Sequence, residues 1–186
     1  TIELPILMYH HMLKSSKLLG DYTITPTEFE NDLKYLKEHG YTTIQVQDLI
    51  SFCNGESTLP EKPVMITFDD GYESVYEYAY PLLKQYGMKA VVSIIGYYTD
   101  LYSKTEEKHI NYSHLTWTQL REMVESSVFE IQNHTYNMHG NNTRRGLRKK
   151  DGETEEEYCS AISADLLQVQ NEVKRNLGIA PTTFTY

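Results

Sequence analysis

The chain has 186 residues, of which 40% are hydrophobic, so it can form one domain with a substantial core and is not a disordered segment. Its formal charge of −9 argues against a nucleic acid or an anionic membrane as the main partner. No apolar run approaches the ~18 residues of a transmembrane segment, and no signal peptide is visible.

Strand-like and helix-like patterns alternate along the chain. Short apolar or β-branched runs indicate strands, and apolar residues at helical spacing indicate helices. The expected strands cover residues 4–8, 42–44, 63–68, 89–95, 129–132 and 180–186. The expected helices cover residues 26–39, 46–53, 81–86, 117–124 and 155–177, whereas 72–80 is irregular or briefly helical and 97–114 and 140–153 are loops.

The helix starts carry a specific local signal. Thr25, Thr116 and Thr154 each stand three residues before a Glu or Gln, which is the capping-box pattern. The strands between the helices are too apolar to face water, which predicts an α/β fold with parallel strands covered by helices. In such folds the working residues lie at the carboxyl ends of the strands.

Chemistry-bearing side chains follow three of the expected strands. His10 and His11 end the first strand, Asp69 and Asp70 end the strand over 63–68, and His134 follows the strand over 129–132. His10 or His11 either lines a cleft or simply packs at its rim. Because separate segments bring these residues to one edge of the sheet, we expect a functional site there.

Asp69, Asp70 and Gly71 directly follow a buried strand. Burying two adjacent carboxylates without a partner costs free energy, and a divalent cation would offset that cost. An isolated Asp-Asp-Gly is more often a simple turn, because Asp and Gly favour turns. The pair therefore indicates a metal site only together with other ligands.

His134 and His139 supply such ligands, since a loop could bring both imidazoles to one ion. Two imidazoles and one carboxylate suit zinc, with cobalt, nickel or manganese as alternatives. The ion would activate water and polarise a carbonyl, and the second aspartate would serve as general base. Alone, two histidines at this spacing are mostly surface residues.

Three other features have less specific interpretations. The 16 tyrosines suit a polar, sugar-binding cleft or merely cover the edge of the core. The basic residues over 144–150 form either a solvated loop or a flap that gathers polar substrate. Cys53 and Cys159 form no C-x-x-C pair, so we expect two buried, structurally inert side chains.

The motifs resemble those of the polysaccharide deacetylase family, also called the NodB-homology domain or carbohydrate esterase family 4. The spacing of the histidines resembles the branch that deacetylates poly-N-acetylglucosamine. The resemblance spans nearly the whole chain and is carried by Ile6-Leu7-Met8-Tyr9-His10-His11, Thr67-Phe68-Asp69-Asp70-Gly71-Tyr72, Tyr78-Ala79-Tyr80-Pro81 and His134-Thr135-x-x-x-His139.

This resemblance implies a distorted (β/α) barrel and the removal of acetyl groups from N-acetylglucosamine units of a cell-wall or exopolysaccharide. By the same resemblance Asp69 is the catalytic base, and Asp70, His134 and His139 hold the metal. Thr135 is expected to order the loop between the two histidines. An extracytoplasmic location, secreted or membrane-anchored, is expected by resemblance only.

The chain also departs from the family pattern. The third family motif would begin at Phe184-Thr185-Tyr186, and the later motifs, including a late histidine acid, are absent. We therefore expect residues 1–186 to be the first two-thirds or so of a catalytic domain, with an incomplete barrel. Such a piece is expected to bind metal, to deacetylate poorly and to self-associate through exposed edges. His10 and Tyr186 are assigned to substrate binding.

Two other functions are compatible with these residues. A non-catalytic glycan-binding or scaffolding domain could keep the fold and lose the reaction. A glycosidase could use Asp69 and Asp70 as acid and base. Neighbouring residues of a strand point to opposite faces, however, so both could flank one glycosidic bond only if the strand breaks there.

Overall fold

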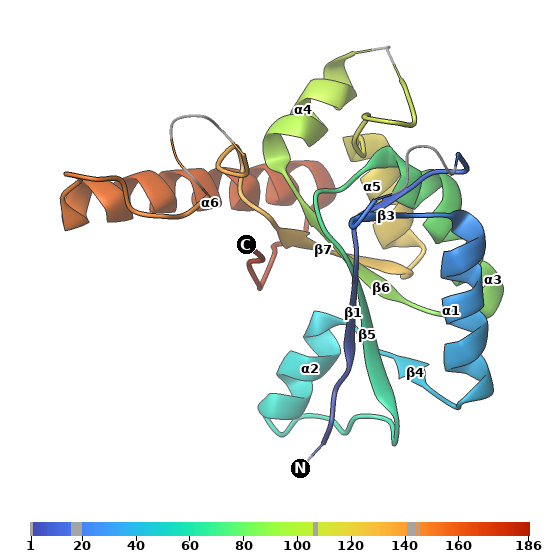
Figure 1. Cartoon of the computed structure of the whole chain (residues 1–186). Helices are drawn as coiled ribbons and strands as arrows, with labels where there is room; N and C mark the ends of the chain where they lie inside the picture. Colours follow the sequence, from blue (N-terminus) through green and yellow to red (C-terminus); the bar gives the residue numbers. More distant parts are fainter. Residues whose placement is uncertain (1, 16–19, 106–107, 141–143, 145) are drawn as a thin grey trace.

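The structure is a computed structural model, and it describes residues 2–15, 20–105, 108–140, 144 and 146–186. Within these residues, the main sheet is five-stranded and parallel, in the order β1-β5-β6-β7, with β4 paired to β5 (Figure 1). This confirms the α/β architecture with a parallel sheet. The strands are β1 (Ile6–Tyr9), β4 (Thr42–Thr43), β5 (Pro63–Phe68), β6 (Ala90–Ile94) and β7 (Phe129–Asn133).

The central strands are buried on both faces, as parallel strands require. Every residue of β6 is buried, and β5 has one half-buried residue, Thr67. Alternate residues of β5 enter different hydrophobic clusters: Ile66 packs with one cluster and Met65 with the other. Figure 1 shows why, since α1 and α3 lie on one side of the sheet and α2 on the other.

The predicted helices are confirmed, with capping boxes at Thr25, Thr116 and Thr154. In each of these caps the threonine side chain accepts a backbone N–H and the Glu or Gln accepts the threonine N–H. The helices expected from the sequence are α1 (Pro26–Glu38), α2 (Val46–Cys53), α3 (Tyr80–Tyr86), α5 (Trp117–Glu125) and α6 (Glu155–Leu177), and a π-helical turn η2 (Val75–Ala79) precedes α3.

One helix contradicts the sequence prediction. Residues 97–114 were expected to be loop, but α4 spans Gly96–Lys104. Its N-cap, Ile95, makes no side-chain capping bond, so no start signal is visible in the sequence. The helix is instead held by tertiary contacts, including the bond from the Trp117 indole N–H to Asp100 at 2.9 Å.

Two smaller expectations are also wrong. Cys53 and Cys159 are both exposed, because Cys53 is the last residue of α2 and Cys159 lies in the first half of α6, which extends away from the sheet. Arg144 is buried rather than solvated, since its guanidinium pairs with Glu153 and lies over the Tyr158 ring. The other described basic residues of that loop, from 148 to 150, are exposed as expected.

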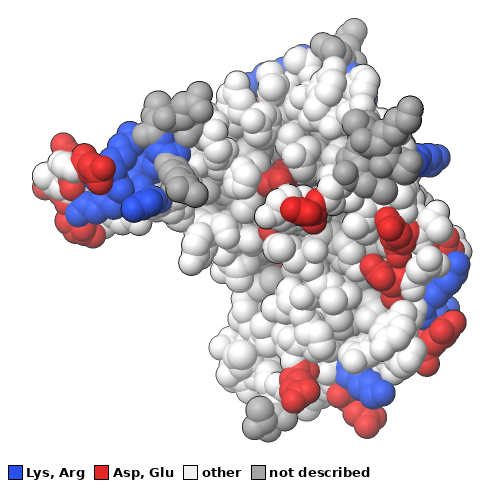
Figure 2. All heavy atoms as spheres, viewed as in Figure 1, with Lys and Arg blue, Asp and Glu red and all other residues white. Residues whose placement is uncertain are grey.

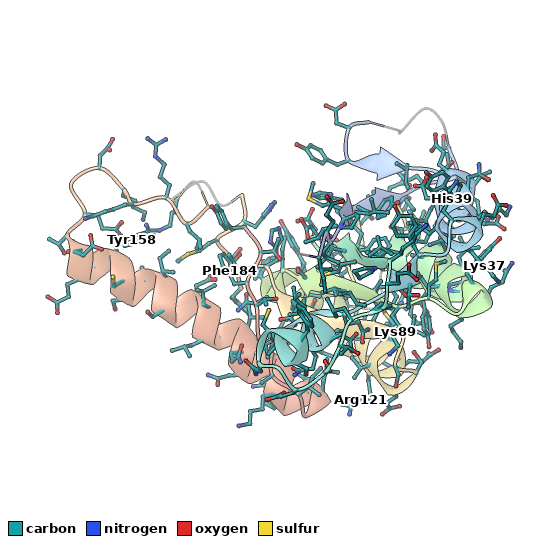
Figure 3. All side chains as sticks on the ribbon, turned by 90° about the horizontal axis from the view of Figure 1, so that it is seen from below. Lys37, His39, Lys89, Arg121, Tyr158 and Phe184 are labelled. Carbon is teal, nitrogen blue, oxygen red and sulfur yellow. The ribbon has the colours of Figure 1, made fainter. Side chains whose placement is uncertain are left out.

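The first half of α6 extends away from the sheet (Figure 1). Figure 3 shows Tyr158 on this extended part and Phe184 nearer the sheet. In Figure 2 the Lys and Arg side chains that gather here lie beside acidic ones. Lys149 pairs with Glu155 at 2.8 Å and Arg144 pairs with Glu153, so two basic side chains of the preceding loop have acidic partners.

The end of the chain continues the sheet beyond β7. Phe184 forms a parallel bridge with Asn133, and the Thr185 N–H donates to the Asn133 carbonyl at 2.9 Å. The strand expected over 180–186 is therefore present only as this short pairing. A two-stranded parallel pair, β2 (His11–Met12) with β3 (Thr23–Ile24), was not expected from the sequence. Among the described residues, no helix is long and apolar enough to cross a lipid bilayer.

Gly96 gives a test of the packing around α4. A Cβ at this position would lie 2.7 Å from Tyr136 Cδ2 and 3.2 Å from Val169 Cγ2. We expect Gly96→Ala to lower the free energy of unfolding by about 1–3 kcal/mol, because the added methyl overpacks this contact. Urea denaturation measures the change. Gly20→Ala is the matched control, since a Cβ there meets none of the described residues within 4 Å, and equal stability of the two variants would contradict this packing.

Candidate metal and catalytic site

A strained turn at the end of β5 presents the two aspartates. The Asp69 N–H still pairs with the Tyr9 carbonyl of β1 at 2.9 Å, but Asp70 and Gly71 adopt φ angles of 68° and 75°. A left-handed aspartate is uncommon and marks a local constraint. Because the strand breaks at Asp70, both carboxylates line the same cleft. The two aspartates can therefore act at one site, although neighbouring residues of a regular strand point to opposite faces.

Gly71 is required at this turn for two reasons. Its φ of 75° is costly for any residue with a side chain, and a Cβ would lie 3.1 Å from Ile94 Cγ2. The glycine thus lets the turn lie directly against β6.

Asp70, His134 and His139 form a cluster of potential metal ligands. Asp70 Oδ1 lies 3.2 Å from His134 Nε2 and 3.6 Å from His139 Nε2. One ligand atom from each residue lies within 4.8 Å of the other two. Asp70 Oδ1 is buried and makes no hydrogen bond of good geometry with the described residues. A buried carboxylate oxygen facing two imidazole nitrogens is the arrangement that a divalent cation satisfies, so the residues fit a metal site.

His134 is held with one nitrogen free for an ion. Its Nδ1 lies 2.8 Å from the Thr185 carbonyl, and since a carbonyl only accepts, Nδ1 carries the proton. Neutral Nε2 then has its lone pair directed toward Asp70. A hydrogen bond of this kind on the far nitrogen is typical of metal-binding histidines.

Thr135 orders the loop that carries His139. Its Oγ1 accepts the backbone N–H groups of Met138 and His139, both at 3.1 Å, and its own φ is 72°. Through these two bonds the Thr135 hydroxyl can order the loop, as the resemblance implies. The His139 side chain remains 49% exposed at the mouth of the site, whereas His134 is buried.

The carboxylates experience opposite electrostatic environments. Burial is the largest influence on Asp70, but the hydrogen-bonding and charge of His134, together with His139, outweigh it and lower the pKa of Asp70. Burial likewise opposes protonation of His134, yet Asp70 and the Thr185 carbonyl raise its pKa. Burial raises the pKa of Asp69, although His134 and His10 partly oppose this. Asp69 is thus the more basic carboxylate of the pair.

A cleft of about 500 Å³ opens over these groups. His10 lies in it with Nε2 3.9 Å from Asp69 Oδ2, and Tyr186 stands at its rim, 93% exposed. All the residues assigned from the sequence to catalysis, metal binding and substrate binding therefore meet in one place. The cleft is lined by Met8, His10, His11, Tyr22, Thr23, Asp69, Asp70, Tyr72, His134, His139 and Tyr186.

A stack of aromatic rings beside the cleft was missed from the sequence. The Tyr72 ring lies between His11 and His114, at centroid distances of 4.3 and 4.6 Å, and His114 also stacks on Tyr98 at 4.4 Å. His114 lies in a segment predicted as loop, where no periodicity indicates burial. The sequence signal that could have indicated aromatic packing here is the high tyrosine content of residues 97–112.

Residues 56–186 match the family described as polysaccharide deacetylase. The chain belongs to the polysaccharide deacetylase family. The resemblance seen in the motifs is therefore confirmed.

Named relatives and solved structures agree with this membership. The chain is 38% identical to the putative polysaccharide deacetylase YxkH of Bacillus subtilis over 72% of its own length and 42% of the relative's. It is 28% identical to a poly-beta-1,6-N-acetyl-D-glucosamine N-deacetylase of Staphylococcus aureus, over 95% of this chain and 57% of that protein. The chain thus spans about half the length of these curated relatives.

The fold also matches a solved structure. A de-N-acetylase from Aggregatibacter actinomycetemcomitans superposes with a TM-score of 0.82 and 29% identity, covering 96% of this chain and 76% of that one. The parallel α/β sheet of this chain therefore has the same arrangement as the sheet of that solved structure. This similarity confirms the α/β fold of the NodB-homology type that the motifs predict.

The buried imidazole of His114 gives a prediction for the stability of this chain. Burial lowers the pKa of His114 from 6.5 to about 4, and the Asp70 charge only partly opposes the shift. Between these values the unfolded chain binds a proton that the folded chain does not, so stability falls as the pH falls below 6.5. We expect this histidine to cost about 2 kcal/mol of stability between pH 7 and pH 5.

Urea denaturation with a metal chelator present, at pH 7, 6 and 5, measures this effect. His114→Gln cannot titrate, so its stability should fall less over the same interval even if it is lower at pH 7. Parallel pH profiles of the wild type and His114→Gln would show that burial does not shift this imidazole.

Proposed function

We propose that this chain carries the catalytic centre of a metal-dependent N-deacetylase that removes acetyl groups from an N-acetylglucosamine-containing polysaccharide. The proposal depends chiefly on one observation: Asp70 Oδ1 is buried without a well-formed hydrogen bond and faces Nε2 of His134 and of His139. The family membership and the named relatives support the reaction class.

Zinc is the ion that this ligand set favours. Two neutral imidazoles and one carboxylate are typical of hydrolytic zinc sites, and cobalt, nickel or manganese can use the same ligands. When bound, the ion supplies Lewis-acid polarisation of the acetamide carbonyl. Asp70, His134 and His139 would hold it.

Asp69 is the proposed general base. Its carboxylate lies in the same cleft as the ligand cluster, and burial raises its pKa toward the range that suits proton abstraction. In the proposed reaction Asp69 takes a proton from the attacking water as the water oxygen bonds to the acetyl carbon. The amide C–N bond then breaks, which releases acetate and an amine that must receive a proton.

His10 is the proposed proton donor to that amine. It faces Asp69 across the cleft, with Nε2 at 3.9 Å from Oδ2. His11 is less suitable, because its Nδ1 contacts the Ser74 hydroxyl at 2.7 Å and its Nε2 contacts the Asn111 carbonyl at 3.2 Å. The family pattern predicts a late histidine acid beyond residue 186, whereas His10 is a candidate within residues 1–186.

The proposed substrate is an N-acetylated glycan of the cell envelope, which implies an extracytoplasmic location. The exposed rings of Tyr22 and Tyr186 at the cleft suit stacking on sugar faces. A non-catalytic glycan-binding domain is the alternative, and it would bind the same polymer without releasing acetate. A glycosidase is disfavoured, because Asp70 lies against two imidazoles that lower the pKa of its carboxyl, which makes it a poor proton donor.

Substitution of the two aspartates tests the proposal. Asp70→Asn should abolish stoichiometric zinc binding, because it removes the charged ligand. Asp69→Asn should keep zinc binding but lower acetate release by about 10²–10⁴-fold, since only proton abstraction is lost. Zinc is quantified by calorimetry on this chain, and acetate release from N-acetylglucosamine oligomers is assayed on the natural protein that carries this sequence.

The outcome of this assay separates the alternatives. If the wild type binds one zinc and the oligomer but releases no acetate, the glycan-binding function replaces the enzyme. If the wild type hydrolyses glycosidic bonds without zinc, the metal-dependent mechanism is wrong.

His10 is tested with a matched histidine control. His10→Gln should lower kcat by about 10²–10⁴-fold, because the amine loses its proton donor. Zinc affinity should stay within twofold of the wild type. His39→Gln, at the far end of α1 (Figure 3), should leave both quantities unchanged. An unaltered kcat in His10→Gln would reject this role.

A further inference from the structure

We propose that Asp165 of α6 is a positioning residue that holds the metal loop, defined as residues 134–139, in the shape in which both of its histidines face one ion. This inference rests on the metal site proposed above. Asp165 itself belongs to none of the sequence motifs and is not among the residues that line the cleft.

The spacing of the two histidines requires such a restraint. Successive residues of a helix turn by about 100°, so residues five apart differ in direction by about 140°. His134 and His139 therefore cannot bind one ion from a regular helix. The loop must be held in a non-helical shape, as the φ of 72° at Thr135 shows.

The Asp165 carboxylate holds the middle of the loop by its backbone. Oδ1 accepts the Tyr136 N–H at 2.7 Å, and Oδ2 accepts the Asn137 N–H at 2.9 Å. Both oxygens of one charged group thus bind consecutive amides located between the two histidine ligands. Charge-assisted bonds of this kind are stronger and shorter than neutral ones.

The other side of the loop is held by the start of α4. The Gly96 N–H donates to the Thr135 carbonyl at 3.1 Å, and the Tyr97 N–H donates to the Tyr136 carbonyl at 2.8 Å. The Tyr136 hydroxyl also donates to Asp100 at 3.0 Å. The loop is therefore fixed between α4 and α6, with its carbonyls toward one helix and its amides toward the other.

Asp165 can act as a restraint because its own position is fixed. One and two turns further along α6, Val169 and Val173 are fully buried in the core. The Asn133 side chain, at the end of β7, donates to the Leu166 carbonyl at 3.1 Å. The carboxylate is thus attached to the same framework that positions His134, and loss of its two bonds would free the segment leading to His139.

Carboxylate substitutions on α6 test this role. Asp165→Asn keeps the shape but leaves only one oxygen to accept two N–H groups. We expect zinc affinity to fall by about 10- to 100-fold, as for other groups that orient metal ligands. Asp165→Glu restores two acceptor oxygens and should recover part of the affinity. Glu156→Gln, the same charge change on the exposed start of α6, should stay within twofold of the wild type.

Amide hydrogen exchange on the metal-free chain provides a second readout that does not depend on zinc. The amides of Tyr136 and Asn137 should exchange at least tenfold faster in Asp165→Asn than in the wild type or Glu156→Gln. Unchanged exchange at both amides, or zinc affinity in Asp165→Asn within twofold of the wild type, would overturn the proposal. If the wild type bound no zinc, the proposed function would fail, while the exchange rates would still decide whether Asp165 holds the loop.

Discussion

A buried carboxylate oxygen without a well-formed hydrogen bond is the constraint on which the site depends. Desolvating the charge of Asp70 is costly, and the nearby imidazoles offset that cost, since they lower the pKa of its carboxyl in spite of burial, yet Oδ1 still has no well-formed hydrogen bond with the described residues. The other features of the site place the two imidazole ligand atoms around this oxygen. The left-handed turn at Asp70 and Gly71 aims the carboxylate into the cleft, and two imidazoles approach it from the loop after β7.

The positions of the two imidazoles are set by hydrogen bonds to and from the backbone around them. His134 is oriented by the Thr185 carbonyl, and His139 is placed by a loop whose amides are bound by Thr135 and Asp165. Each of these partners lies on a different segment, so the site can form only when β7, α6 and the end of the chain are packed together. Such preorganisation lowers the entropic cost of closing a loop around an ion.

The parallel sheet explains why distant segments meet at this point. Parallel strands β1, β5 and β7 end at the same edge, so residues that follow them become neighbours even though as many as 124 positions separate His10 from His134. The same edge also carries an aromatic stack in which Tyr72 separates His11 from His114. The stacked rings and the bonds of His11 to Ser74 and Asn111 connect this side of the cleft to the neighbouring segments.

Local sequence alone determined the capped helices, the apolar strands and the identity of the ligands. Thr25, Thr116 and Thr154 act through residues three positions away, so their caps are readable without tertiary information. Tertiary structure decided what depends on contacts distant in sequence. It turned residues 96–104 into a helix without a capping side chain, exposed both cysteines and brought Asp165 to the metal loop. No local pattern encodes these outcomes. Each depends on how one element packs against another, or on whether it packs against the sheet at all.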